Sequence, residues 1–152
     1  TSFACPVVAG VVALMLEANP DLTWRDVQAI LVTTALRVDD DTDPSAAVNG
    51  AGLWHSNQYG FGIVDAAAAV EAAEGWNNLT PEGMESVTLS GLNMQIPDDA
   101  SDPVISSITL EDSNLSVETV HVYVSLEHSS RGHLGILLTS PGGMVSELVS
   151  GM

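Results

Sequence analysis

The chain has 152 residues, of which 45% are hydrophobic, so we expect a folded core in one full domain or two small ones rather than disorder. Its 20 acidic residues against 3 basic ones give a formal net charge of −17, which argues against nucleic acid as a partner because a phosphate backbone would be repelled. A cationic substrate, divalent cations or a saline environment suit such a surface, and so does a simple gain in solubility.

The longest apolar stretch, residues 6–16, falls short of the ~20 residues that cross a bilayer, so we interpret it as a buried core helix. The single cysteine, Cys5, excludes an internal disulfide. The chain opens without a methionine and shows no signal peptide, so we expect a fragment from within a longer gene product.

Helical periodicity and abundant alanine mark the chain up to about Gly75. A first helix is predicted over residues 6–18, ending at the Asn-Pro pair that follows, because proline disfavours helical backbone in the residue before it. A second helix is predicted after Thr23, a good N-cap with Asp26 as a weak capping-box partner. A third, alanine-rich helix is predicted between its cap, Asp65, and the closing Gly75.

An acidic run, Asp-Asp-Asp-Thr-Asp over residues 39–43, separates the second helix from the third. As a calcium loop it lacks the glycine at the sixth position and the bidentate acid at the twelfth, where Pro44 and Gly50 stand. We therefore interpret it as a solvated acidic loop. A Gly-rich turn and a short strand are predicted over residues 59–64.

From about Ser86 onward the pattern changes to period two and is rich in Val, Ile, Thr and Ser, which is typical of an antiparallel β module. The stretch before it has the Gly, Asn and Pro content of a linker. Five strands are predicted, over residues 86–91, 106–112, 117–128, 134–140 and 144–150.

A polar pair, Thr1 and Ser2, precedes the first predicted apolar helix. A hydroxyl is a poor nucleophile unless a base takes its proton and the resulting oxyanion is stabilised. The start of a helix can stabilise the oxyanion, since its first N–H groups are unpaired and its dipole end is positive. Spacing alone leaves open that Thr1 or Ser2 is only an N-cap.

The segment Thr-Ser-Phe-Ala-Cys-Pro, residues 1–6, resembles the nucleophile segment of the subtilisin-like serine proteases (subtilases), which reads Gly-Thr-Ser-x-Ala-x-Pro. Residues 16–31 are similar to a helix pair of the kexin and proprotein convertase branch, and residues 55–70 to the end of its catalytic domain. Residues 117–148 resemble the early strands of the P domain, which follows the protease domain in convertases. The resemblance covers nearly the whole chain in the right order.

The resemblance implies that Ser2 is the nucleophile and that its backbone N–H contributes to the oxyanion hole, while Thr1 shapes its turn. The catalytic Asp and His and the oxyanion Asn would all precede the serine, so we expect this fragment by itself to be inactive. Cys5 is expected to be a buried, inert thiol, and Phe3 to crowd the pocket side of the turn. No cofactor-binding residue is identified.

The four histidines inherit no triad role, and we expect them to be exposed strand or turn residues. Zinc binding by the three in the β half is the less favoured interpretation, so no metal ligand is assigned. His55 is expected in a loop, and the other three on or beside strands: His121, His128 and His133.

The resemblance implies an α/β fold class followed by an all-β portion. Residues 1–75 would be the C-terminal part of a subtilisin-like domain with a doubly wound parallel sheet. Residues 76–85 would be a linker, and residues 86–152 the truncated start of a P domain, a β-barrel or jelly-roll.

The complete protein would then be a serine endopeptidase that cleaves proteins after basic residues through an acyl-enzyme on Ser2. The resemblance further implies structural calcium, peptide substrates with basic sites, an inhibitory propeptide and the secretory pathway (Golgi, membrane or secreted). Two sequons, at Asn78 and Asn114, give weak support for that route. Two alternatives stay open: a non-catalytic cell-surface or binding module with a degenerate protease half, and a P-domain subtilase of broad specificity.

Overall fold

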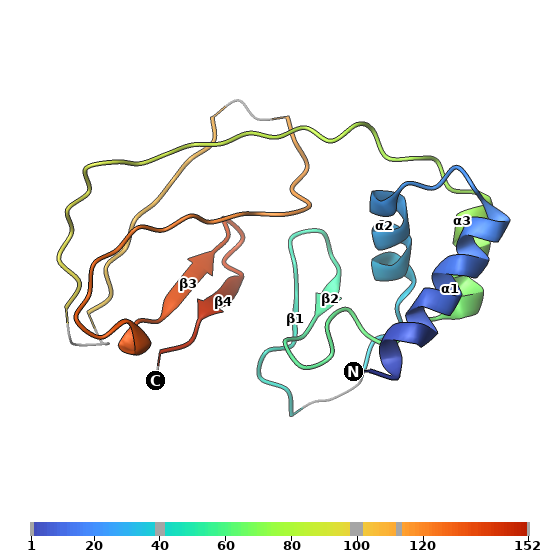
Figure 1. The fold of residues 1–152 in the computed structure, drawn as a ribbon, viewed down its shortest axis with the longest axis horizontal. Coiled ribbons are helices and arrows are strands. Elements are labelled where there is room, and N and C mark those ends of the chain that lie inside the picture. The colour runs from blue at the N-terminus through green and yellow to red at the C-terminus, as the bar shows by residue number, and fades with distance from the viewer. Residues whose placement is uncertain (1, 39–41, 98–101, 112–113, 152) are drawn as a thin grey trace. The chain divides into compact units, whose positions relative to one another are not determined.

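The computed structural model describes residues 2–38, 42–97, 102–111 and 114–151. Its contacts divide the chain into two compact units. One consists of the residues up to Thr80 together with Leu137–Leu148, and the other of Pro81–Ile136 together with the residues from Val149. The α-helices of the described residues belong to the first unit (Figure 1), and no helix in the described ranges has the length and apolar character needed to cross a bilayer.

The first helix, α1 (Ala4–Ala18), begins two residues earlier than the sequence predicts and ends where predicted. Alanine, leucine and methionine favour it, and Pro6 lies in the first turn, where an N–H has no partner inside the helix anyway. Asn19 takes an extended conformation because Pro20 follows it. Its N–H still donates to the carbonyl of Met15 at 2.9 Å, which closes the last turn.

The second helix, α2 (Trp24–Thr34), starts with the predicted capping box. The Thr23 hydroxyl accepts from the N–H of Asp26 at 3.3 Å, and the Asp26 carboxylate accepts from the N–H of Thr23 at 2.8 Å. Both N–H groups would otherwise lack a partner at the helix start. The local sequence therefore determines where α2 begins.

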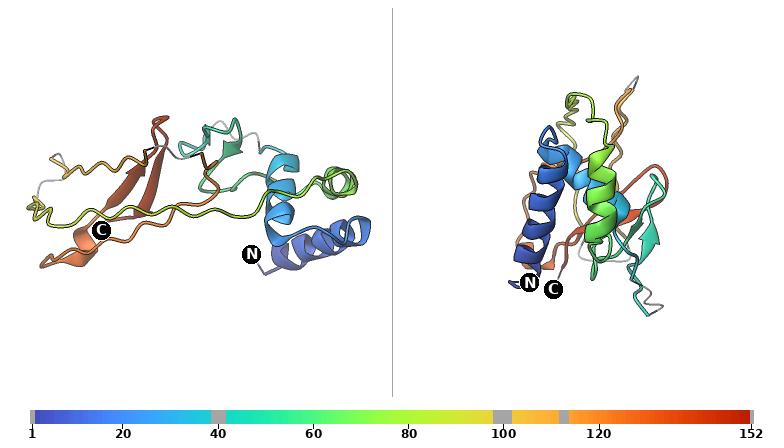
Figure 2. Two further views of the ribbon diagram at one scale, coloured as in Figure 1. Left: turned by 90° about the horizontal axis from the view of Figure 1, so that it is seen from above. Right: turned by 90° about the vertical axis from the view of Figure 1, so that its right-hand side faces the viewer.

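The third helix, α3 (Ala66–Glu74), is favoured by its six alanines and is capped as predicted. Asp65 Oδ1 accepts from the N–H of Ala68 at 3.0 Å, and Gly75 stands at the C-terminal end. α3 packs against both α1 and α2, and Figure 2 shows α1 and α3 side by side. The small core between the three helices consists of Val11, Met15, Leu22, Ile30, Ala69 and Ala73.

The chain between α2 and α3 forms a small antiparallel pair, β1 (Ala47–Val48) with β2 (Trp54–His55), which the sequence did not indicate. In place of the short strand predicted near residue 63, Leu36 and Ile63 form a single antiparallel bridge. Gly62 is required beside this bridge because its φ is +125° and a Cβ there would collide with the carbonyl of Leu36.

Two of the five predicted strands are confirmed: β3 (Ile136–Thr139) and β4 (Val145–Val149) pair in a two-stranded sheet. They follow a short 3₁₀ turn, Arg131–His133. The other three predictions were wrong, because the described residues between 86 and 128 form no strand. A strand exists only where a neighbour completes its ladder of hydrogen bonds, and alternating residues supply no such neighbour.

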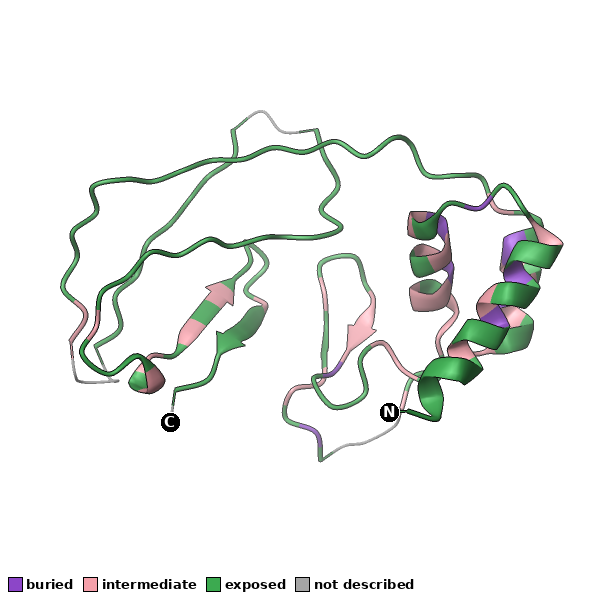
Figure 3. Ribbon diagram, in the orientation of Figure 1, coloured by how far each residue is buried: buried purple, intermediate pink, exposed green. Residues whose placement is uncertain are grey.

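The prediction that α1 is buried was also wrong. Figure 3 shows α1 largely exposed, and only Val11 and Met15 of the helix are buried. Val7 is 59% exposed and Leu14 50% exposed. The reason is that α3 covers one side of an all-round apolar helix, while the described residues leave the remaining sides open.

Candidate active site

Ser2 lies in the turn that leads into α1, directly before the N-cap residue Phe3, and it is exposed. It is therefore not the N-cap, which removes for Ser2 the alternative that the sequence left open. Thr1, predicted to shape this turn, lies outside the described residues. Within the described part of the chain the Ser2 side chain makes no hydrogen bond, so no base for its hydroxyl is found there.

The start of α1 has no side-chain cap. Phe3 occupies the N-cap position with φ −87° and ψ −28°, and the first turn contains no acidic residue. By contrast, Thr23 caps α2 and Asp65 caps α3. The first N–H groups of α1 and the positive end of its dipole therefore face no anionic or hydroxyl group of the helix itself. This end of α1 can stabilise negative charge on an oxygen that approaches Ser2.

Two residues beside Ser2 differ from their predicted surroundings. Cys5 is an exposed free thiol, not a buried one, because α3 packs along the Val11–Met15 face of α1 and the first turn is left uncovered. Phe3 is 91% exposed and so crowds no pocket among the described residues.

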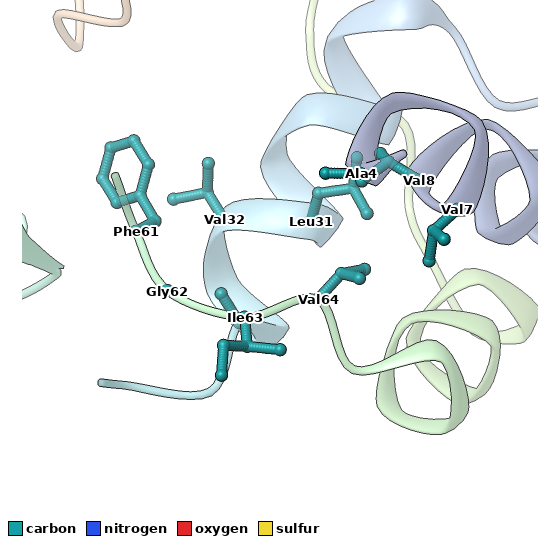
Figure 4. A pocket seen from close by; sticks show the side chains of 10 residues that line it. Ala4, Val7, Val8, Leu31, Val32, Phe61, Gly62, Ile63 and Val64 are labelled. Atoms are coloured by element: carbon teal, nitrogen blue, oxygen red, sulfur yellow. The ribbon is translucent and has the colours of Figure 1, made fainter. Parts of the chain in front are cut away.

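An apolar hollow of about 500 Å³ lies beside α1 (Figure 4). Its walls come from α1, α2 and the segment before α3, and they include no charged side chain. It therefore offers apolar surface to a neighbouring part of a protein and has no group that would recognise a basic substrate. Its lining consists of Ala4, Val7, Val8, Leu31, Val32, Ala35, Phe61, Gly62, Ile63 and Val64.

Two of the histidines are less exposed than predicted. His55 lies on β2 rather than in a loop, is half-buried, and packs edge-on against Phe61 with ring centroids 5.2 Å apart. His128 is half-buried, and its Nδ1 lies 3.1 Å from the backbone nitrogen of Ser130. The two that are exposed as predicted are His121 and His133.

A buried polar cluster forms around Asp43, which the sequence had suggested to be solvated. Asp43 accepts from the backbone N–H of Ser45 at 2.9 Å, from the Ser45 hydroxyl at 2.6 Å and from the Ser56 hydroxyl. The hydrogen bonds from Ser45 and Ser56 lower the pKa of this carboxyl although burial opposes them. The other acids of the run, residues 39–41, lie outside the described residues.

The Asp43 cluster is not a second catalytic serine site. Ser56 is 1% exposed, and its oxygen accepts from the N–H groups of Gln58 and Tyr59 at 3.0 and 3.1 Å while its proton goes to Asp43. Its oxygen therefore has no lone pair left to attack a carbonyl. The Asp-x-Ser spacing in the sequence could have predicted the turn in which Asp43 bonds to Ser45. No local sequence pattern indicates that Ser56 also bonds to Asp43.

The described residues do not fit a metal site. No group of three or more His, Cys, Asp or Glu side chains comes together among them. The two oxygens of Asp43 accept from N–H and O–H donors, which occupy the positions a cation would take. Neither the calcium that the family resemblance implies nor zinc is therefore assigned to the described residues.

The chain matches two protein families in sequence. Residues 1–62 match the subtilase family, and residues 117–151 match the proprotein convertase P-domain. The first match includes Ser2 and the exposed start of α1, and the second includes β3 and β4.

Relatives that carry both parts match nearly the whole chain. A PC3-like endoprotease (variant B) of Hydra vulgaris is 41% identical over 99% of the chain and 22% of its own length. Human proprotein convertase subtilisin/kexin type 7 is 40% identical over 96% of the chain and 19% of its own length. Kexin of Saccharomyces cerevisiae is 33% identical over 97% of the chain and 19% of its own length. The chain thus spans about a fifth of the length of these curated relatives.

The fold is similar to that of a solved protease. The crystal structure of a serine protease of Aeromonas sobria matches 96% of the chain and 28% of its own length, with a TM-score of 0.66 and 27% identity. The chain thus carries a subtilase segment, residues 1–62, followed by a P-domain segment, residues 117–151. Within the subtilases it belongs to the kexin and proprotein convertase type. The alternative of a binding module with a degenerate protease half is not favoured by these relatives.

Proposed function

We propose that this chain is the serine-bearing part of a longer serine endopeptidase of the kexin type, with Ser2 as the nucleophile. The observation that carries the proposal is the position of Ser2, the serine of the Thr-Ser-x-Ala-x-Pro motif, at the uncapped start of α1, in a chain that matches kexin-type relatives almost from end to end. The exposure of Ser2 supports the proposal because a nucleophile must reach a substrate carbonyl.

The reaction would proceed through an acyl-enzyme. Ser2 Oγ attacks the scissile carbonyl carbon and gives its proton to a histidine supplied by another part of the protein, which an aspartate orients. The carbonyl oxygen becomes an oxyanion close to the Ser2 N–H and the positive end of α1. When the carbon–nitrogen bond breaks, the leaving amine takes the proton from the histidine. Water then hydrolyses the ester on Ser2.

The helical part would be the end of the catalytic domain. We propose that residues 1–75 complete a doubly wound parallel-sheet domain, that residues 76–85 form a linker, and that residues 86–152 begin a P domain of β-barrel or jelly-roll form. Thr1 would shape the turn of Ser2. The apolar surface of α1 supports this assignment, because a helix that is apolar on every side requires cover on every side.

Substrates would be proteins cleaved after basic residues, often in pairs. The net charge of −17 supports a cationic substrate. Membership of the family is consistent with a calcium requirement of the whole enzyme, with an inhibitory propeptide and with work in the secretory pathway. A P-domain subtilase of broad specificity is distinguished by its cleavage pattern.

The test is expression of the complete protein with Ser2 intact and as Ser2→Ala, followed by profiling on a peptide library. Ser2→Ala should abolish turnover, whereas Cys5→Ala, a change three residues further along in the first turn of α1, should leave most of it. Cleavage restricted to bonds after basic residues supports the kexin type. Cleavage without preference for basic residues would instead support the subtilase of broad specificity. Turnover by the Ser2→Ala variant would show that Ser2 is not the nucleophile.

A further inference from the structure

The segment that follows α3, residues 76–80 (here called the strap), is held against the start of α2. The indole N–H of Trp76 donates to Asp26 Oδ1 at 3.0 Å, and the backbone N–H of Leu79 donates to the same oxygen at 2.8 Å. Trp76 is half-buried against the core, so the strap is packed as well as hydrogen-bonded. The first half of the stretch that resembles a linker is therefore fixed to a helix.

Two further hydrogen bonds fasten the strap on either side of Asp26. Arg25 Nη1 donates to the carbonyl of Thr80 at 2.7 Å, and Asn78 Nδ2 donates to the carbonyl of Asp21 at 2.6 Å. Both are exposed to solvent, where a hydrogen bond contributes little because water competes for the same groups. The buried member of the set, Asp26, is therefore the one that holds the strap most strongly.

The two oxygens of Asp26 serve different partners. Oδ2 accepts from the N–H and the hydroxyl of Thr23, at 2.8 and 2.6 Å, and so belongs to the cap of α2. Among the described residues, the donors to Oδ1 all belong to the strap and are the indole N–H of Trp76 and the backbone N–H of Leu79. The carboxylate is completely buried, and four donors fill its acceptor positions. A side chain that only capped α2 would leave one oxygen buried without a partner.

Burial by itself raises the pKa of Asp26, but the hydrogen bonds from the Thr23 hydroxyl and the strap outweigh it and hold the pKa well below its ordinary range. The group therefore stays ionised in the folded chain. Hydrogen bonds to a charged acceptor are about twice as strong as those between neutral groups.

We infer that Asp26 is a positioning residue that anchors the strap and so fixes the point at which the chain leaves the three helices. The strap lies between the segment matched to the subtilase family, residues 1–62, and the segment matched to the P-domain, residues 117–151. A single buried carboxylate thus determines where the connection between the two begins. This role is independent of the nucleophile assigned to Ser2.

The test uses amide hydrogen exchange of the full chain, read at Leu79, and the indole N–H resonance of Trp76. Asp26→Ala should speed exchange at Leu79 about tenfold or more and shift the Trp76 indole signal. Thr23→Ala is the matched control, because it removes a cap donor from Oδ2 and leaves both strap donors in place. It should change exchange at Leu79 less than about threefold.

Two results would overturn the inference: unchanged exchange at Leu79 in Asp26→Ala, or equal acceleration there by Asp26→Ala and Thr23→Ala, which would make Asp26 a helix cap only. If Asp26→Ala fails to fold, Trp76→Phe decides, since it removes one strap donor and keeps the cap. Faster exchange at Leu79 with unchanged helical circular dichroism supports the anchor, and unchanged exchange contradicts it.

Discussion

Met15→Ala should destabilise the helical unit strongly, because Met15 is completely buried where α1 packs on α3. Truncating a fully buried methionine costs about 2–5 kcal/mol, since the transfer free energy is lost and a cavity is left behind. Folded units of this size have free energies of unfolding of roughly 4–12 kcal/mol, so the change would remove a large share of the stability. It would also loosen α1, the helix that carries Ser2 at its start.

Leu14→Ala is the matched control for Met15→Ala, because Leu14 is the adjacent residue of the same helix and is 50% exposed. Truncating the Leu14 side chain should lower the free energy of unfolding by about 1 kcal/mol. Urea unfolding of both variants, at a protein concentration below the onset of aggregation and followed by far-ultraviolet circular dichroism, gives the two free energies. An effect of Met15→Ala no larger than that of Leu14→Ala would refute the packing of α1 on α3.

Three other predictions concern acid, activity and solubility. Because hydrogen bonds lower the pKa of Asp26 and Asp43 in the folded chain, the stability they contribute is complete above their ordinary value of 3.8 and is lost as the pH falls below it. A melting temperature that stays constant from about pH 6 to about pH 3 would contradict this. The chain alone should neither cleave a fluorogenic peptide with basic residues nor react at Ser2 with a serine-directed phosphonate, since the described residues offer its hydroxyl no base; stoichiometric labelling would show otherwise. The chain should bind a hydrophobic dye and aggregate through the apolar side chains that the described residues between 86 and 127 expose, and a monomer that unfolds cooperatively without binding dye would argue against that.

The sequence predicted those features that depend on neighbouring residues. The capping box of Thr23 and Asp26 spans three residues, so its pattern is visible without a structure. The bond between Asp26 and Trp76 spans fifty residues and has no local signal, so the anchor of the strap was not foreseen. The same holds for Asp43, whose buried partner Ser56 lies thirteen residues further along the chain.

Hydrophobic pattern indicates that a surface needs cover but does not tell what covers it. The apolar character of α1 led to a prediction of burial, yet α3 covers only the side that carries Val11 and Met15. Alternation in residues 117–128 likewise led to a predicted strand, but a strand requires a partner edge, and none of the described residues provides one there. The position of Ser2 was indicated by its motif, while its exposure and the uncapped helix beside it came from the structure.

The central claim is that Ser2 is the nucleophile of a serine endopeptidase. Its most direct test is labelling of the complete, active protein with a serine-directed phosphonate that carries a basic residue, followed by mass spectrometry of the labelled peptide. We predict one label per molecule on Ser2, and a loss of turnover of about a millionfold in Ser2→Ala with the fold unchanged. A label on another serine, or a Ser2→Ala protein that retains about a tenth of the activity, would contradict the claim.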